Sequence, residues 1–386
     1  MSRKFQTVGS LLRPEGLLKY KNQIEHRDDI TYPFYNDFEG YEACECEATK
    51  DVVKDQTRHG LTILTDGEYS KSMWHLDFVW GLKGIDRYIA EHGYFFRDKD
   101  LKGHYETRRD IGIRITGPLS GRNHHFNKVF KRLTEYAPPD AVVKQCVWAP
   151  AHAYTELTVF DKLAGAGCVY ETNDALKQGL VNAYKEFVEE YASIGGKILQ
   201  FDDCLWELFA ADNENSPFTG SAESPELQGI AEEFVAINNE VIDYGHSLGL
   251  TMWTHNCRGN YSSRNMCGGS YAAIANLFLG SQRYDRFFLE WDDDRAGSLD
   301  ALATFKDKPE AEIVLGLLSS KTNTLDDEDR VIHLLDEACN IIPKERLFLS
   351  HQCGFASCDG GNELTKDEQW AKIDQGQKLA FDYWRE

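Results

Sequence analysis

The chain has 386 residues, of which 42% are hydrophobic and 12% aromatic, and its formal net charge at pH 7 is −21. This composition is typical of a globular protein with a sizeable core, and the negative charge argues against nucleic acid and anionic membranes as partners. No apolar run approaches the ~18 residues of a membrane span, and the first residues lack the apolar segment of a secretory signal. Ten cysteines without compact disulfide spacing indicate reduced thiols, so we expect a cytoplasmic protein.

Short apolar runs alternate with amphipathic stretches along most of the chain. The apolar runs predict strands, in chain order, at residues 7–11, 61–64, 111–116, 142–148, 197–201, 250–254, 286–290, 313–317 and 347–350. Apolar residues that recur at intervals of three and four predict helices at residues 39–59, 173–194, 226–248, 328–340 and 366–384. This alternation favours a parallel α/β fold.

Polar or charged residues follow many of the predicted strands. They are Ser10, Asp66, Glu68, Asp202, Asp203, His255, Glu290 and Cys353. A doubly wound open sheet concentrates its chemistry at one or two crossovers, whereas a (β/α)8 TIM barrel builds its active site from all the C-terminal strand ends. Because six strand ends carry such residues, we predict a single (β/α)8 TIM barrel over residues 1–386. The polar, aromatic-dotted section around 85–110 is interpreted as an insertion or arm, available for contacts in a homo-oligomer.

Three strand ends carry residues that bind thiophilic metals. His255 and Cys257 alternate at the end of one predicted strand, so both side chains point to the same side. Glu290 ends a second apolar run and Cys353 follows a third. One imidazole, two thiolates and one carboxylate suit tetrahedral Zn²⁺, and we predict a zinc site.

Other interpretations of these residues stay open. His351 is a competing ligand to Cys353, Cys358 is a spare thiol nearby, and Glu290 alone is also typical of a solvated loop acid. Glu68 and Asp202 suit recognition of a substrate ammonium group, although turn acids at the surface have the same pattern.

The segment 72–77 contains aromatic side chains. Together with Trp148 and Trp206, they can stack on a flat ring or simply fill the core. The chain has no Walker loop, no G-x-G-x-x-G motif and no local Ser-His-Asp signature.

Taken together, six segments resemble the catalytic barrel of cobalamin-independent methionine synthase, in particular its short, single-barrel bacterial members. These are Val8-Gly-Ser10 with Arg13-Pro14, Leu64-Thr-Asp-Gly-Glu68, Gln200-Phe-Asp-Asp203, His255-Asn-Cys257, Phe288-Leu-Glu290 and Gln352-Cys-Gly354. The resemblance spans residues 8–384 with the motifs in family order.

The resemblance implies a zinc-dependent methyltransferase that activates homocysteine as a thiolate and methylates it to methionine. The implied zinc ligands are His255, Cys257, Glu290 and Cys353. The residues implied to bind the amino acid part of homocysteine are Ser10, Glu68 and Asp202. Lys321 stands where the family has a histidine proposed to protonate the folate, so it is either an acid or an anion clamp.

The methyl donor is left open by the sequence, with a methyltetrahydrofolate expected and a corrinoid or another methyl compound as alternatives. We expect no second barrel of the kind that helps full-length methionine synthases receive polyglutamyl folate. A second possible function is alkyl transfer to another thiol such as coenzyme M. A third is a non-catalytic binding protein on the same barrel, with zinc in a structural role. Glu68 and Asp202, as ammonium binders, argue against a sulfonate thiol.

Overall fold

The computed structural model describes residues 2–97, 103–160, 169–210, 225 and 227–385. Its α-helices are α1 (Glu15–Ile24), α2 (Tyr41–Arg58), α3 (Leu76–Trp80), α4 (His125–Tyr136), α5 (Pro150–Thr155), α6 (Asn173–Ser193), α7 (Glu207–Ala210), α8 (Gln228–Ser247), α9 (Glu328–Cys339) and α10 (Lys366–Trp384). Its strands are β1 (Ile63–Leu64), β2 (Lys83–Tyr88), β3 (Phe95–Arg97), β4 (His104–Glu106), β5 (Gly112–Ser120), β6 (Val142–Trp148), β7 (Ile198–Asp202), β8 (Thr251–Asn256), β9 (Arg286–Glu290), β10 (Glu312–Leu318) and β11 (Leu347–His351). Shorter 3₁₀ and π turns connect them.

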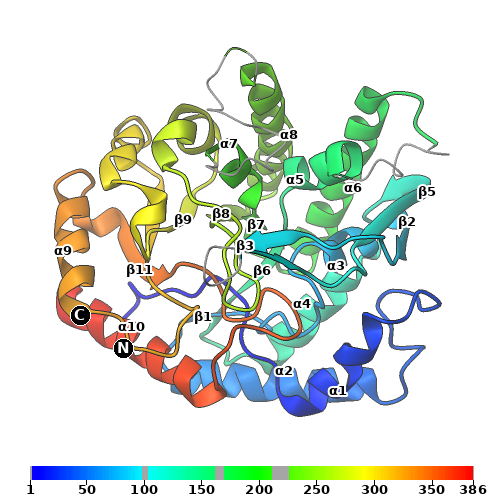
Figure 1. Cartoon of the computed structure of the whole chain (residues 1–386), viewed down its shortest axis with the longest axis horizontal. Coiled ribbons are helices and arrows are strands. Elements are labelled where there is room, and N and C mark those ends of the chain that lie inside the picture. Colours follow the sequence, from blue (N-terminus) through cyan, green and yellow to red (C-terminus); the bar gives the residue numbers. More distant parts are fainter. Residues whose placement is uncertain (1, 98–102, 161–168, 211–224, 226, 386) are drawn as a thin grey trace.

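Seven parallel strands of the described residues form one curled sheet in the order β1-β6-β7-β8-β9-β10-β11, with helices around its outer face (Figure 1). Each of these strands except β11, the last, is followed by a crossover to the next strand of the sheet, as the alternating pattern of the sequence predicts. The register places Trp148, Asp202 and His255 level on β6, β7 and β8. The carboxyl ends of neighbouring strands therefore lie at one edge, as in a TIM-like barrel.

The prediction of a closed eight-stranded barrel is wrong for the described residues. The predicted first strand, residues 7–11, makes no ladder, and the preceding residues touch β11 through one parallel bridge between Phe5 and Leu349. The Lys144 ammonium instead donates hydrogen bonds to the carbonyls of Thr7 and Val8, each at 2.8 Å. The Leu11 N–H donates to the Gly67 carbonyl at 2.9 Å, so this segment is tied to the barrel by single hydrogen bonds and not by a strand ladder.

The predicted strand at residues 111–116 exists as part of β5, but it lies outside the curled sheet. β5 pairs antiparallel with β2, and β3 pairs antiparallel with β4. β3, β4 and most of β2 fall in the section predicted as an arm, and β5 follows that section; the β2–β5 ribbon lies at the right edge of the molecule in Figure 1. An apolar run alone does not reveal its pairing partner, which explains the wrong assignment.

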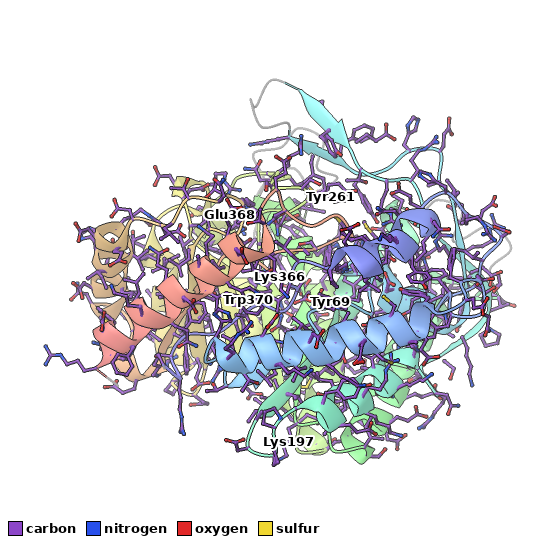
Figure 2. The ribbon with its side chains drawn as sticks, turned by 90° about the horizontal axis from the view of Figure 1, so that it is seen from below. Tyr69, Lys197, Tyr261, Lys366, Glu368 and Trp370 are labelled. Carbon is purple, nitrogen blue, oxygen red and sulfur yellow. The ribbon has the colours of Figure 1, made fainter. Side chains whose placement is uncertain are left out.

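The five long predicted helices are confirmed as α2, α6, α8, α9 and α10, within a few residues at each end. α10 begins with a capping box in which Thr365 and Glu368 bond each other's backbone N–H. Figure 2 shows α10 and α2 next to each other along the outside of the molecule. The His59 ring stacks on Trp370 at 4.5 Å, and Lys366 pairs with Asp55 at 2.7 Å. Early and late parts of the chain are thus packed together.

The interior of the sheet holds a small apolar cluster beneath the carboxyl edge. Its members are Val8, Ile198, Trp253, Phe288, Val314 and Phe348. Two buried cations lie against these rings, Lys144 over Phe288 at 4.5 Å and Arg286 over Trp253 at 4.1 Å. Among the described residues, no helix is long and apolar enough to cross a membrane.

Candidate metal and substrate site

A cavity of about 460 Å³ opens at the carboxyl edge of the sheet. Its walls come from the ends of β7 and β8, the loop after β11 and the arm, in a region near Tyr261. In Figure 2 Tyr261 lies at the opposite side of the barrel from Lys197, which precedes β7. The cavity therefore has the location that parallel α/β barrels use for catalysis.

A cluster of thiols and one imidazole forms one wall of this cavity. The ligand atoms of Cys204, His255 and Cys257 all lie within 4.8 Å of one another, and the Cys204 and Cys257 sulfurs are 3.3 Å apart. Cys353 belongs to the same buried cluster as the two thiols, and all four residues line the cavity. The sequence predicted three of these four residues, while Cys204 was missed.

The protonation of these groups favours a bound cation. The pKa of the Cys353 thiol is raised well above its usual range by its neighbour Cys257 and by burial. The hydrogen bond with Cys257 lowers the pKa of Cys204, but burial together with the nearby Glu207 and Cys353 raises it to about 12. Both ring nitrogens of His255 are buried without a hydrogen-bond partner in the described structure. An imidazole with two orphaned nitrogens among thiols fits Zn²⁺, which satisfies such groups and keeps thiols ionised.

Glu290, the fourth predicted ligand, is held by other groups. One of its carboxylate oxygens lies 2.9 Å from Arg295 Nη2 and 3.5 Å from Lys321 Nζ, and the other accepts from the backbone N–H of Arg258 at 2.7 Å. Burial raises the pKa of Glu290, but the cations, Lys321 first, bring it below its usual value. Neither Glu290 nor Lys321 lines the cavity.

The predicted ammonium-binding acids do converge on the cavity. Single oxygens of Glu68 and Asp202 and the Cys146 sulfur lie within 4.8 Å of one another. Gln200 donates to Asp202 at 2.7 Å, and Lys71 lies 3.1 Å from Glu68. Burial, as the first cause, raises the pKa of both acids. The Glu68 backbone has φ of 59°, a left-handed conformation that costs free energy in a non-glycine residue and occurs often at functional sites.

Ser10 joins this group through the loop that carries Cys353. The Ser10 hydroxyl accepts from the Ala356 N–H at 3.2 Å, and its carbonyl accepts from the Phe355 N–H at 2.9 Å. A Cβ on Gly354 would lie 2.0 Å from the Ser10 hydroxyl, so only glycine allows this approach. The N-terminal segment thereby positions the Cys353 loop.

The alternative site residues of the sequence lie elsewhere. His351 is buried between Phe5 and Phe355, with ring centroids at 5.7 and 4.8 Å, and does not line the cavity. Cys358 belongs to the main hydrophobic core. Of the predicted aromatic walls, residues 73–75 line the cavity, whereas Trp148 and Trp206 are fully buried and do not line it.

The arm supplies most of the aromatic wall opposite the thiol cluster. The cavity-lining residues of the arm are Tyr88, Ala90, His92, Gly93, Tyr94, Phe95, Phe96, Ile111 and Gly112. Two further carboxylates line the cavity, Glu156, which accepts from the Tyr94 hydroxyl at 2.7 Å, and Glu207. Burial raises the pKa of Glu207 to about 8. These residues could not be recognised from the sequence, because the order of residues does not show which way the arm folds.

No protein-family model matches the chain. It is 33% identical over 379 residues to the uncharacterised protein YxjH of Bacillus subtilis, covering 98% of this chain and 94% of YxjH. A solved structure of a putative vitamin-B12 independent methionine synthase from Listeria monocytogenes is 26% identical, with TM-score 0.68 and coverage of 99% and 98%. A B12-independent methionine synthase from Shewanella sp. W3-18-1, solved with selenomethionine, has the same fold at 18% identity, TM-score 0.70 and coverage of 99% and 98%.

Proposed function

The chain belongs to the family of Bacillus subtilis YxjH, and from that premise we propose that it is a zinc-dependent methyltransferase that converts homocysteine to methionine. The observation that carries this proposal is the buried His255 with two unpartnered ring nitrogens among thiols, in a cavity that also contains Glu68 and Asp202. Its likeness to the Listeria structure at 26% identity supports the same class of reaction.

His255, Cys257 and Cys353 would hold the zinc, with Glu290 predicted as the fourth ligand. When bound, the metal supplies one piece of chemistry, which is to keep the sulfur of a substrate thiol ionised at neutral pH. A decrease of about two units in a thiol pKa corresponds to about 2.7 kcal/mol of differential stabilisation.

The amino acid part of the substrate is bound by residues on the other side of the cavity. Glu68 and Asp202 accept from the ammonium group, and Gln200 orients Asp202 through its 2.7 Å hydrogen bond. Lys71, at 3.1 Å, keeps the buried Glu68 ionised. A sulfonate thiol such as coenzyme M has no ammonium group for these acids, which makes homocysteine the better substrate.

The methyl donor that we propose is a methyltetrahydrofolate. Its pterin ring can stack on the aromatic wall formed by Trp74 and Tyr94, and its N–H groups can donate to Glu156 or Glu207. Lys321 faces Glu290 at 3.5 Å and does not line the cavity, so we propose neither of its two predicted roles toward the donor and assign it to the charge balance of Glu290.

The test combines metal analysis with turnover. The purified protein is assayed for zinc and then for methionine formation from homocysteine, with methyltetrahydrofolate supplied as mono- and triglutamate. One zinc per chain with turnover supports the proposal. Zinc and homocysteine binding without turnover would retain the thiol site and reject the folate donor. Absence of zinc, or turnover of coenzyme M in preference to homocysteine, would reject the proposed function.

A further inference from the structure

The cavity at the carboxyl edge of the sheet is lined by acids and aromatic rings. Its carboxylates are Glu68, Glu156, Asp202 and Glu207, and among the described residues no lysine or arginine lines it. Its aromatic rings are those of Trp74, Tyr88, Tyr94, Phe95, Phe96 and Tyr261. We propose that this cavity accepts, besides a folate, a cationic methyl donor, namely a small sulfonium or quaternary ammonium compound. This inference rests on the proposed function for the thiol acceptor and adds a further class of donor.

The charge of the cavity favours a positively charged ligand. Lys71 pairs with Glu68 and does not line the cavity. His75 and His152 do line it, but burial lowers the pKa of His75 well below its ordinary value and that of His152 to about 3, so both imidazoles are neutral. Electrostatic complementarity to these walls requires a cation, and the net charge of −21 on the whole chain attracts cations at long range.

Trp74 places an aromatic ring beside the thiol cluster. Its partly exposed side chain lines the cavity and packs against the cluster of Cys204, Cys257 and Cys353. Its backbone N–H donates to the Ser357 carbonyl at 2.8 Å, which ties it to the loop that carries Cys353. The face of an indole is the best aromatic surface for a quaternary ammonium or sulfonium group. A methyl group bound on this ring is therefore close to the sulfur that receives it.

Two carboxylates supply the countercharge. Glu207 is 4% exposed, and its Oε2 is buried without a hydrogen-bond partner in the described part of the chain. Tyr94 donates its hydroxyl hydrogen to Glu156 at 2.7 Å, so His75 Nε2 donates to the Tyr94 oxygen at 3.2 Å, and ring and carboxylate are held in one wall. The charge of an onium group compensates such carboxylates, and its polarised C–H groups contact their oxygens.

The transfer from an onium donor balances without an acid. The homocysteine sulfur, after release of its proton to solvent, forms a bond to the methyl carbon. The bond between that carbon and the onium atom breaks, and its electron pair stays with the leaving group. A neutral sulfide or tertiary amine departs without taking up a proton, whereas the nitrogen displaced from methyltetrahydrofolate needs one. Lys321, predicted as that acid, pairs with Glu290 and does not line the cavity, which suits an onium donor.

The first measurement is calorimetric titration of the full, zinc-loaded chain with choline and with 3,3-dimethyl-1-butanol, which has the same shape without the charge. We expect choline to bind about tenfold more tightly than the alcohol, or better, because only choline gains from the aromatic faces and carboxylates. Equal affinity for the two compounds, or binding of neither, would overturn the inference.

Variants of the cavity wall locate the binding. Trp74→Leu should lower the affinity for choline about tenfold with little change for the alcohol, and Trp74→Phe should give a smaller loss. Glu207→Gln, which removes a charge but little volume, should also weaken choline alone. The matched control is Trp384→Leu, which removes a ring at the end of α10 that does not line the cavity.

A thermal melt checks that each variant is folded. If Trp74→Leu is not, Trp74→Phe and Glu207→Gln carry the test. Unchanged choline affinity in the folded Trp74 and Glu207 variants would overturn the proposed site.

The second measurement is methionine formation from homocysteine with trimethylsulfonium or choline as donor. We expect methionine and dimethyl sulfide in equal amounts from trimethylsulfonium, and a lower rate from choline, because an amine is a poorer leaving group than a sulfide. A parallel assay with methyltetrahydrofolate tests the proposed donor separately. Turnover of the folate but of neither onium compound would overturn this inference alone. Turnover of an onium compound alone would reject only the folate, and no methionine from any donor would reject both.

Discussion

Lys71 Nζ lies 3.1 Å from Glu68 Oε1, and the two side chains are 0% and 5% exposed. Burial raises the pKa of Glu68, and Lys71 is the first of the groups that oppose this effect. A carboxylate that must bind an ammonium group is useful only while it is ionised. In the proposed function the lysine would act on substrate binding through the glutamate, because it does not itself line the cavity.

Substitution Lys71→Met should weaken homocysteine binding, because the buried Glu68 then takes up a proton. We expect KM for homocysteine to rise at least tenfold with a smaller change in kcat, and stability to fall by about 3 kcal/mol. Steady-state kinetics and urea denaturation measure the two effects.

The double variant Lys71→Met with Glu68→Gln provides the control. It removes both charges, so most of the lost stability should return while homocysteine binding stays weak. Normal homocysteine binding in either variant would contradict the assignment of Glu68 as an ammonium binder.

Removal of metal by a strong chelator should destabilise the protein, because a ligand that binds only the folded state adds to its stability. At a free zinc concentration about 1,000-fold above Kd this contribution is about 4 kcal/mol. A thermal melt with and without chelator measures it, and added Zn²⁺ should restore the melting temperature. Cys353→Ala, which lacks a proposed ligand, should melt at the same temperature with and without chelator. A chelator effect of equal size in that variant would exclude Cys353 as a ligand.

Lys144→Met should weaken the attachment of the N-terminal segment to the sheet. The lysine ammonium donates to the Thr7 and Val8 carbonyls and to Gln200 Oε1 at 2.6 Å, so the variant loses three charge-assisted hydrogen bonds in the interior. We expect a loss of about 3 kcal/mol in urea denaturation. Lys185→Met, which removes a partly exposed ion pair to Glu240, should cost less than about 1 kcal/mol. Equal losses of stability in the two variants would contradict a larger contribution from the buried Lys144 ammonium.

The pH dependence of stability should contain a contribution from Lys308. Burial lowers its pKa from the ordinary 10.5 to about 8, while its ammonium donates to the Leu279 and Gln282 carbonyls. Between about pH 8 and pH 10.5 the unfolded chain holds a proton at this site that the folded chain has released. Unfolding then takes up protons, so stability rises with pH across this window.

The difference between the unaltered protein and Lys308→Met isolates this contribution from other groups that titrate in the same range. We expect the unaltered protein to gain about 1–2 kcal/mol relative to the variant between pH 8 and 10.5, after allowance for the partial exposure of the lysine. Denaturation curves at several pH values supply the measurement. A constant difference across the window would mean that Lys308 titrates normally.

The sequence predicted elements better than their pairing. The long helices were found because their apolar stripes have a single period, and all seven strands of the curled sheet fall within a residue or two of their predicted bounds. The predicted strand at residues 7–11 was wrong, because the segment is tied to the barrel by single contacts such as that of the Thr7 carbonyl with Lys144, 137 positions away. Such tertiary contacts are invisible to periodicity.

The candidate site was predicted in part. His255, Cys257 and Cys353 come together at the cavity, and Glu68, Asp202 and Ser10 line it. Cys204 also follows the end of a strand, so the rule that identified the other ligands applies to it. The two acids before it were instead interpreted as ammonium binders, and the thiol was not considered. The ion pairs that hold Glu290 could not be foreseen, because Arg295 and Lys321 reach it from separate loops.

The attachment of the Cys353 loop to Ser10 has a consequence for folding. The contacts of Ser10 with Phe355 and Ala356 join residues about 345 positions apart, among the largest sequence separations in the molecule. Contacts of this kind form late, because a long loop must close before they are made. His255 and Cys257 can be in place before Cys353 joins them. A chain that binds zinc with full affinity has therefore brought its two distant ends together, so metal affinity reports on complete folding.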